Sequence, residues 1–285
     1  MLLHQAMSVN GKLLDLLSDA LSDDAFGDDV TSKLLGDKGR VCVSAVVRSR
    51  QSGVFSGEAV VEALSRILSG TLEFQCEFEE GQRIEEQAIV ARLAGPVGEI
   101  LSTERTLLNF LSHACGVATT TRQFVDAVQP HRAKILATRK TLPGLRELQL
   151  TAVIAGGGFI HRRSLSDGIL IKDNHRALVG GVELIRLAKE KRSPLHRIEI
   201  EVQDGALLDR VLPERPDVIM LDNMDLEEIA NAIQKIDGCC AIEVSGGVSL
   251  SSVGAIAALG VDYISVGALT HSVRALDLTL DIGAA

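Results

Sequence analysis

Apolar and polar positions follow a mixed pattern in the first part of the chain. Apolar residues at helical spacing predict an amphipathic helix over residues 10–22 and a long helix from Ser102 to about Val128, with Thr103 as its N-cap. Alternation of apolar and polar residues predicts strands over 41–47, 74–78 and 89–93, and another apolar stripe predicts a helix over 58–69. This pattern is typical of a sheet with helices beside it.

After about residue 130, short apolar runs alternate with helical stretches. The runs predict strands over 134–137, 168–171, 198–202, 218–221, 240–244 and 263–266. The stretches between them predict helices over 144–155, 178–191, 204–212, 225–236 and 249–259. Apolar strands that are each followed by a helix are typical of a parallel sheet covered by helices. We therefore predict an α/β fold in which this sheet is closed, or nearly closed, into a barrel.

Composition narrows the classes of function. The chain has 285 residues and a net charge of −9, and nucleic-acid-binding domains are usually basic, so we expect no nucleic-acid partner. Its five cysteines show no metal-ligand spacing and are expected to be reduced thiols. We find no signal-peptide pattern and no apolar run of the roughly 18 residues that a membrane span needs. We expect a cytoplasmic protein with no membrane partner.

Positive charge is concentrated in one segment of this acidic chain. Residues 131–176 hold nine Lys and Arg against three acids. Clustered arginines present planar donor pairs that match carboxylates and phosphates. The segment therefore predicts a site for a small ligand with several negative charges.

Polar residues also stand at the carboxyl ends of six predicted strands, where the active sites of α/β barrels lie. They include Thr138, Arg139, Lys140, Lys172, Glu201, Asp222, Ser245, Gly246, Gly247 and Gly267. Because six strand ends carry such groups, we predict an active site at this edge of the sheet.

Two of these groups favour phosphate and metal binding. Ser245-Gly246-Gly247 and the segment from Gly267 to His271 follow the last two strands, where backbone N–H groups can hold a phosphate; tight turns are the alternative. Glu201 and Asp222 end neighbouring strands and suggest Mg²⁺ ligands. The alternative is that Glu201 neutralises Arg139 or Lys172, and the alternation of the strand does not rank Glu199 against Glu201. Lys172 or Lys140 can also be interpreted as a Schiff-base lysine.

Several strings closely resemble the quinolinate phosphoribosyltransferase family (nicotinate-nucleotide pyrophosphorylase, decarboxylating). In the family's order they are Gly27-Asp-Asp-Val-Thr31, the stretch Glu104 to Thr119, Thr138-Arg-Lys-Thr-Leu-Pro-Gly-Leu-Arg146, Gly156-Gly-Gly-x-x-His-Arg162, Leu170-Ile-Lys-Asp-Asn-His175, Met220-Leu-Asp-Asn-Met224, Ser245-Gly-Gly and Gly267-Ala-Leu-Thr-His-Ser272. The resemblance runs from about residue 23 to residue 272.

The resemblance implies both a fold and a reaction. It implies an N-terminal α/β sandwich over 1–115, with the tail 272–285 packed back on it, and an incomplete, open α/β barrel over 116–271. The enzyme would be a pentosyltransferase that joins quinolinate to 5-phosphoribosyl 1-pyrophosphate with Mg²⁺ and releases pyrophosphate and CO₂ to give nicotinate mononucleotide, a step of NAD biosynthesis. It would be a homodimer with shared active sites, or a higher oligomer.

The resemblance also implies roles for individual residues. Quinolinate would be bound by Arg139, His161, Arg162 and Lys172, with Arg105 from the partner subunit. Lys140, Glu201 and Asp222 would be the catalytic residues, with Lys140 near the pyrophosphate and the two acids near the ribose hydroxyls and the metal. The 5-phosphate would be held by Ser245, Gly246, Gly247, Gly267 and His271.

One position departs from the family pattern. The family commonly has Lys-Tyr-Ala-Val where this chain has Leu150-Thr151-Ala152-Val153, so a cation is missing beside the cationic segment. This leaves room for a paralogous phosphoribosyltransferase with another acceptor, like the molybdate-operon protein ModD. Two different classes of function also fit the sequence: a barrel lyase with a Schiff base on Lys172, and a sensor that binds phosphoribosyl pyrophosphate without turnover.

Overall fold

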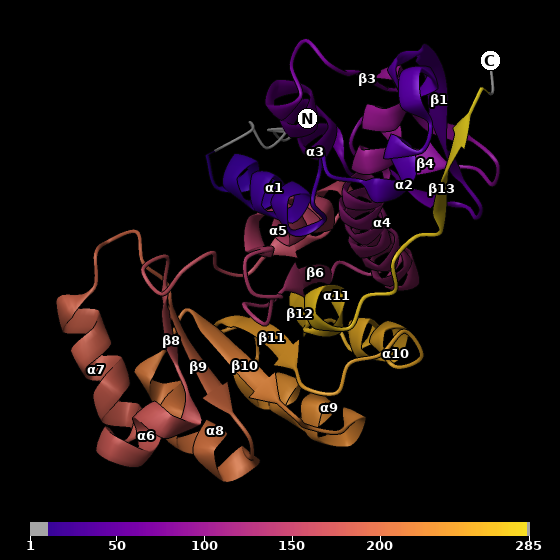
Figure 1. Ribbon diagram of the computed structural model, residues 1–285. Helices are drawn as coiled ribbons and strands as arrows, with labels where there is room; N and C mark the ends of the chain where they lie inside the picture. Colours follow the sequence, from indigo (N-terminus) through magenta and orange to yellow (C-terminus); the bar gives the residue numbers. More distant parts are fainter. Residues whose placement is uncertain (1–10, 284–285) are drawn as a thin grey trace. The chain divides into compact units, whose positions relative to one another are not determined.

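The structure, a computed structural model, describes residues 11–283 and divides into two compact units (Figure 1). The first unit holds the chain up to Arg122, the segment Thr141–Gly157 and the chain from Ser272 onward. The second unit holds Gln123–Lys140 and Gly158–His271. The first position of the helix expected over 10–22, the start of the chain and the last two residues of the tail lie outside the described residues.

The first unit contains a four-stranded antiparallel sheet in the order β13-β1-β5-β3. Its strands are β1 (Cys42–Ser49), β3 (Glu73–Cys76), β5 (Ile89–Pro96) and β13 (Leu278–Ile282), and a small pair is formed by β2 (Gly53–Val54) and β4 (Arg83–Ile84). Residue 282 of the C-terminal segment lies opposite residue 45 of β1. The last described residues therefore complete a sheet that begins near the start of the chain.

Helices accompany this sheet in the sequence, and α1, α3 and α5 bury apolar side chains. They are α1 (Gly11–Asp23), α2 (Val30–Lys33), a short 3₁₀-helix (Gly36–Arg40), α3 (Glu58–Ile67), α4 (Val97–Ala127) and α5 (Arg146–Ala155). The N-cap prediction for Thr103 is wrong, because α4 begins at Val97. Thr103 is fully buried inside the helix, where its hydroxyl donates a hydrogen bond of 2.8 Å to the carbonyl of Glu99. A Thr in a helix interior makes this bond to the preceding turn.

The second unit is built on a seven-stranded parallel sheet in the order β7-β6-β12-β11-β10-β9-β8. The strands are β6 (Lys134–Ala137), β7 (Phe159–Ile160), β8 (Ile169–Ile171), β9 (Ile198–Val202), β10 (Val218–Asp222), β11 (Ala241–Ser245) and β12 (Tyr263–Val266). In the described residues the edge strands β7 and β8 do not pair with each other, so the barrel is open. This confirms the α/β fold with an incomplete barrel of parallel strands.

Helices follow the strands of this sheet and lie along its outer side (Figure 1). They are α6 (Asp173–Val179), α7 (Gly181–Lys191), α8 (Gly205–Val211), a 3₁₀-helix (Leu212–Glu214), α9 (Leu226–Ile236), α10 (Val253–Ala258) and α11 (Ala268–His271). The helix predicted over 178–191 is wrong at its start, because α6 and α7 meet at Gly180. The φ of Gly180 is +97°, a conformation that glycine adopts more readily than other residues. None of the helices in the described part of the chain is long and apolar enough to cross a bilayer.

Candidate active site

The acids of β9 are buried side chains of the barrel. All five residues of this strand are buried, and Glu199 and Glu201 are only 7% and 6% exposed. Because side chains alternate along a strand, both acids lie on the same side of the sheet. A buried carboxylate is costly unless it is paired, so the partners of these two acids define the site.

Glu201 is paired with Lys172. Lys172 directly follows β8 and caps the start of α6, and its ammonium group forms an ion pair and hydrogen bond with Glu201 Oε1. The structure therefore shows one of the two neutralising pairs that the sequence left open. A Schiff base requires the Lys172 nitrogen to be free to attack a carbonyl carbon, and here that nitrogen is held by Glu201. The contact thus argues against a Schiff base on Lys172.

Glu199 is paired with His161. His161 follows β7, and its backbone N–H donates to the carbonyl of Ala137, which places it beside the end of β6. Its Nε2 lies 2.7 Å from Glu199 Oε2 and 3.5 Å from Glu243 Oε2. Burial alone would lower the pKa of His161, but the bond to Glu199 and the charges of the two acids outweigh it and raise the pKa.

Glu243 belongs to this cluster and was missed by the sequence analysis. It is only 2% exposed on β11, and Ser265 Oγ of β12 donates to its Oε1 at 2.5 Å. Burial and the nearby charge of Glu199 raise the pKa of Glu243 to about 8. One signal was available: Glu243 stands two residues before Ser245, which places both on one side of the strand.

The cluster has donor atoms of the kind that metals use, because one ligand atom from each of His161, Glu199 and Glu243 lies within 4.8 Å of the others. The separation of 2.7 Å between His161 and Glu199 is a hydrogen-bond distance. We therefore interpret the group as a hydrogen-bonded network.

Arg139 and Arg162 carry positive charge that no ion pair in the described residues compensates, although Glu199, Asp167 and Glu201 act on Arg162 from a greater distance. Among residues 11–283 neither guanidinium has an ion-pair partner within 4 Å, and Arg139 Nε is buried without a hydrogen bond. Arg162 donates to the carbonyl of Gly168 at 3.3 Å, and burial followed by the charge of Arg139 lowers the pKa of Arg162. Two arginines that destabilise each other's charge and have an unused donor fit an anionic ligand.

The predicted phosphate loop is close to Asp222. Asp222 and Ser245 are register partners on β10 and β11, and the next residue, Asn223, donates from its side chain to Asp222 Oδ2 at 2.9 Å and from its backbone to the carbonyl of Ser245 at 2.9 Å. Gly246 has a φ of +94°, and a Cβ there would lie 2.2 Å from Asn223 Oδ1, so this close approach requires glycine. At Gly247 a Cβ would meet nothing within 4 Å, which leaves its backbone accessible.

The other predicted phosphate residues meet around Lys140. A Cβ on Gly267 would lie 2.8 Å from His271 Nε2 and 3.6 Å from Lys140 Cδ. The hydroxyl of Thr270 donates to the carbonyl of Lys140 at 2.8 Å. The second unit thus brings Lys140, Gly267 and His271 together.

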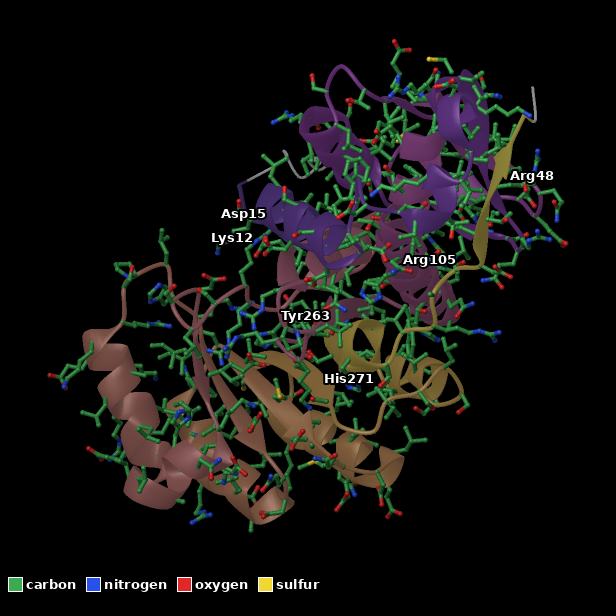
Figure 2. The ribbon with its side chains drawn as sticks, in the orientation of Figure 1. Lys12, Asp15, Arg48, Arg105, Tyr263 and His271 are labelled. Carbon is green, nitrogen blue, oxygen red and sulfur yellow. The ribbon has the colours of Figure 1, made fainter. Side chains whose placement is uncertain are left out.

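Arg105 is the one predicted site residue that belongs to the first unit. It is exposed on α4 (Figure 2), whereas the other predicted site residues all belong to the second unit. Leu150, where the family commonly has Lys, is 2% exposed on α5 of the first unit. Its side chain is part of an apolar core, so the missing cation is a feature of core packing.

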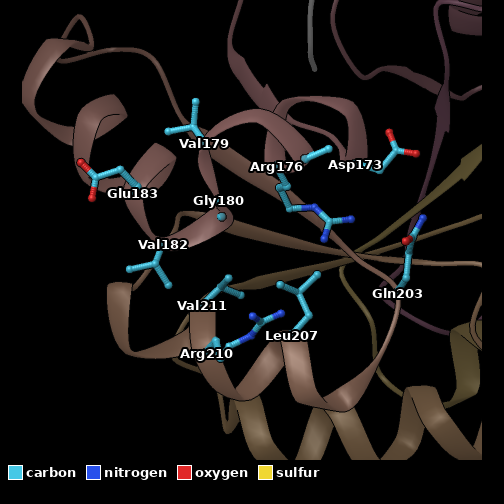
Figure 3. Close-up of a pocket in the computed structure, with 12 residues that line it drawn as sticks. Asp173, Arg176, Val179, Gly180, Val182, Glu183, Gln203, Leu207, Arg210 and Val211 are labelled. Carbon is cyan, nitrogen blue, oxygen red and sulfur yellow. The ribbon is translucent and has the colours of Figure 1, made fainter.

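The cavities in the described part of the second unit include one of about 520 Å³ beside α8 and α9, which contains none of the predicted site residues. Two others bear on the argument. One, of about 410 Å³, borders His161, Arg162, Glu199 and Glu243 and extends to the amino ends of the strands, where its lining includes Tyr263. The other, of about 590 Å³, is lined by α6, α7, α8 and the residues between them, including Arg176, Leu207 and Arg210 (Figure 3). The second cavity contains none of the predicted site residues, so only the first is connected with the site.

Comparisons with known proteins agree with this geometry. The family models "Quinolinate phosphoribosyl transferase, C-terminal domain" and "Quinolinate phosphoribosyl transferase, N-terminal domain" match residues 117–281 and 29–115. The chain is 39% identical to a nicotinate-nucleotide pyrophosphorylase [carboxylating] of Mycobacterium leprae, with 94% of this chain and 96% of that protein covered. It is 35% identical to a probable enzyme of the same name from Bacillus subtilis, with 92% and 90% covered.

Solved structures give the same result. The nicotinate-nucleotide pyrophosphorylase of Francisella tularensis superposes with a TM-score of 0.88 at 33% identity, covering 98% of this chain and all of that one. The corresponding protein of Ehrlichia chaffeensis superposes with a TM-score of 0.87 at 35% identity, covering 94% and 97%. The chain therefore belongs to the quinolinate phosphoribosyltransferase family, a family of phosphoribosyl-transferring enzymes of NAD biosynthesis.

Proposed function

We propose that this enzyme transfers the phosphoribosyl group of 5-phosphoribosyl 1-pyrophosphate to quinolinate and releases pyrophosphate and CO₂, with nicotinate mononucleotide as the product. The carrying observation is the uncompensated pair Arg139 and Arg162 beside the ion-paired Lys172 and His161, in a chain of this family. The names of the relatives describe the reverse reaction, in which the nucleotide is carboxylated and the free base is released.

Quinolinate supplies the two negative charges that this cationic group needs. Its adjacent carboxylates would be bound by Arg139 and Arg162, with Lys172 and His161 as further donors. The unused buried Nε of Arg139 and the mutual repulsion of the two guanidinium groups support this assignment. A bidentate contact with a carboxylate removes both costs.

Phosphoribosyl pyrophosphate would extend across the neighbouring strand ends. The accessible backbone at Gly247, next to Ser245 and Gly246, and the group of Gly267 and His271 suit the 5-phosphate. Lys140, which lies beside Gly267, would bind the pyrophosphate. Glu201 and Asp222 would face the ribose hydroxyls.

The residues present fit Mg²⁺. Glu201 and Asp222 supply carboxylate oxygens near the ends of the neighbouring strands β9 and β10, and Mg²⁺ prefers oxygen ligands and shares them with water and substrate phosphates. When bound, the ion would neutralise charge on the pyrophosphate. We assign Glu201 and Asp222 as the residues that would hold it.

The proposed reaction needs positioning and charge more than proton transfer. The ring nitrogen of quinolinate forms a bond to C1′ while the bond from C1′ to the pyrophosphate oxygen breaks. Lys140 stabilises the negative charge on the departing pyrophosphate. The carboxylate of Glu201 stabilises the positive charge that develops on the sugar. The C2 carboxylate then leaves as CO₂, the positively charged ring nitrogen stabilises the electron pair left on C2, and this carbon takes up a proton.

We further propose a homodimer with shared sites, in which Arg105 of the partner subunit completes the quinolinate site. Arg105 is exposed on a helix of the first unit, so it is available to a neighbouring molecule. We also propose a cytoplasmic location, which is supported by the five free cysteines.

The experiment is an incubation with quinolinate, phosphoribosyl pyrophosphate and Mg²⁺, with nicotinate in a parallel reaction. We expect nicotinate mononucleotide and CO₂ in equal amounts from quinolinate and no nucleotide from nicotinate. Binding of phosphoribosyl pyrophosphate without product from quinolinate would show that the acceptor is another anion.

A further inference from the structure

We propose that Glu243 is a positioning residue for His161: held by Ser265, it fixes the imidazole so that the ring presents its other nitrogen to a carboxylate of the acceptor. The inference rests on the proposed function, because it assumes that His161 binds quinolinate. It adds a residue to the site, and it gives a reason for a second buried acid at the same ring nitrogen.

The geometry at His161 Nε2 is the first step. Both acids lie at the same ring nitrogen, Glu199 at 2.7 Å and Glu243 at 3.5 Å. Nε2 is therefore the nitrogen that faces the protein, and Nδ1 is left for a ligand. An imidazole that donates from both nitrogens carries a positive charge, which is the form that binds a carboxylate.

The support of Glu243 is the second step. Glu243 is only 2% exposed and its carboxyl group accepts a hydrogen bond from Ser265 Oγ at 2.5 Å, so it has a fixed place in the barrel. Glu199, in contrast, has one buried oxygen without a hydrogen-bond partner. A short bond from Glu199 alone would permit the ring and the acid to move together, whereas a second acid fixed from β12 holds the ring in one orientation.

The protonation of Glu243 is the third step. With a pKa of about 8, Glu243 keeps its proton at neutral pH. It therefore holds its place beside the ring as a neutral carboxyl group.

The cavity beside the cluster decides which substitution tests the idea. Because the cavity of about 410 Å³ borders Glu243, a truncated side chain would admit water and alter the barrel in several ways. Glu243→Met keeps the approximate volume and removes both carboxyl oxygens, whereas Glu243→Gln keeps an oxygen for Ser265 and imitates the protonated acid. Ser265→Ala is the second variant, since it leaves the acid and removes its support. Tyr263→Phe is the matched control, because Tyr263 lines the same cavity and has no part in the proposed mechanism.

The test combines steady-state kinetics with NMR of the histidine rings in the full-length, substrate-free protein. In Glu243→Met we expect the KM for quinolinate to rise at least tenfold, with the KM for phosphoribosyl pyrophosphate unchanged and kcat within threefold of wild type. In Glu243→Gln we expect the KM for quinolinate to stay within threefold of wild type. The ring signals of His161, assigned with His161→Gln, should shift in Glu243→Met and in Ser265→Ala and stay in place in Tyr263→Phe.

Two results overturn the inference. One is a wild-type KM for quinolinate with unshifted His161 signals in Glu243→Met, and the other is an equal rise of both KM values in that variant and in the control. A wild-type enzyme that does not convert quinolinate would overturn the proposed function instead. In that case the His161 signals, which need no substrate, still decide whether Glu243 fixes the ring.

Discussion

The buried acid Glu243 makes the stability of the second unit depend on pH, and the direction follows from its raised pKa. The ordinary value for Glu is about 4.5, and the folded value is about 8. Between these values the folded state holds a proton that the unfolded state has lost. The free energy of unfolding therefore falls as pH rises from about 5 to 8. His161, whose pKa is also raised, contributes in the same direction as pH rises past its ordinary value of 6.5.

The size of the effect has an upper limit. One proton changes the free energy of unfolding by at most about 1.4 kcal/mol per pH unit, so Glu243 contributes up to about 3 kcal/mol between pH 6 and pH 8. In Glu243→Gln this contribution is absent, and the plot of unfolding free energy against pH should be flatter than in wild type. The difference between the two proteins should be largest at pH 6 and should shrink toward pH 8.

The chain offers a local probe for this measurement. It has no Trp, and its one Tyr, Tyr263, lies in the second unit as the register partner of Glu243. Urea unfolding followed by tyrosine fluorescence at pH 6, 7 and 8 and constant ionic strength thus reports on the barrel that contains the cluster. Glu214→Gln is the control, because the hydrogen bond from Arg186 lowers the pKa of Glu214 and so places its titration below this pH range. Parallel plots for wild type and Glu243→Gln would refute the reasoning.

Three further predictions concern the site and the core. Arg162→Ala should raise the KM for quinolinate, with a loss of about 2–5 kcal/mol of binding free energy, because a bidentate contact with a carboxylate is removed. Steady-state kinetics of this variant beside the exposed neighbour Arg163→Ala checks this prediction, and equal kinetics of the two variants would contradict it. Gly246→Ala should lower the unfolding midpoint and weaken binding of phosphoribosyl pyrophosphate, since its Cβ would lie 2.2 Å from Asn223 Oδ1; unchanged calorimetric titrations would contradict this. Leu150→Lys should lower the free energy of unfolding by about 3 kcal/mol, measured by urea unfolding. It should give no gain in quinolinate affinity, measured by titration. Tighter quinolinate binding would mean that position 150 does reach the site.

Periodicity predicted most strands of the barrel well, because their apolar residues stand in short runs or in strict alternation. The expected runs over 134–137, 198–202 and 263–266 match β6, β9 and β12 at both ends. The two-residue strand β7 was not predicted, because a segment of that length has no periodicity to detect. Its pairing with β6 depends on the tertiary fold.

The pairings inside the site could not be read from the sequence. Alternation placed Glu199 and Glu201 on one side of β9, but their partners come from segments that are 38 and 29 residues away in the chain. Glu243 was overlooked because an acid inside an apolar strand resembles a polar position on a solvent-facing side. The sheet order, which brings β11 beside β12, gives it a buried partner in Ser265.

The arrangement of charge on β9 explains how one segment can hold so many cations and still bind an anion. Glu201 compensates Lys172, and Glu199 compensates His161, so these two cations are held in place before a ligand arrives. In the described part of the chain no acid lies within ion-pair distance of Arg139 or Arg162, and their charge is therefore left for the ligand. If both acids of β9 were replaced by apolar residues, four cations would repel one another around the empty site. If the arginines were also ion-paired, the site would gain little from binding a dicarboxylate. A doubly charged acceptor requires both kinds of cation: two that are compensated and orient the ligand, and two that are uncompensated and attract it.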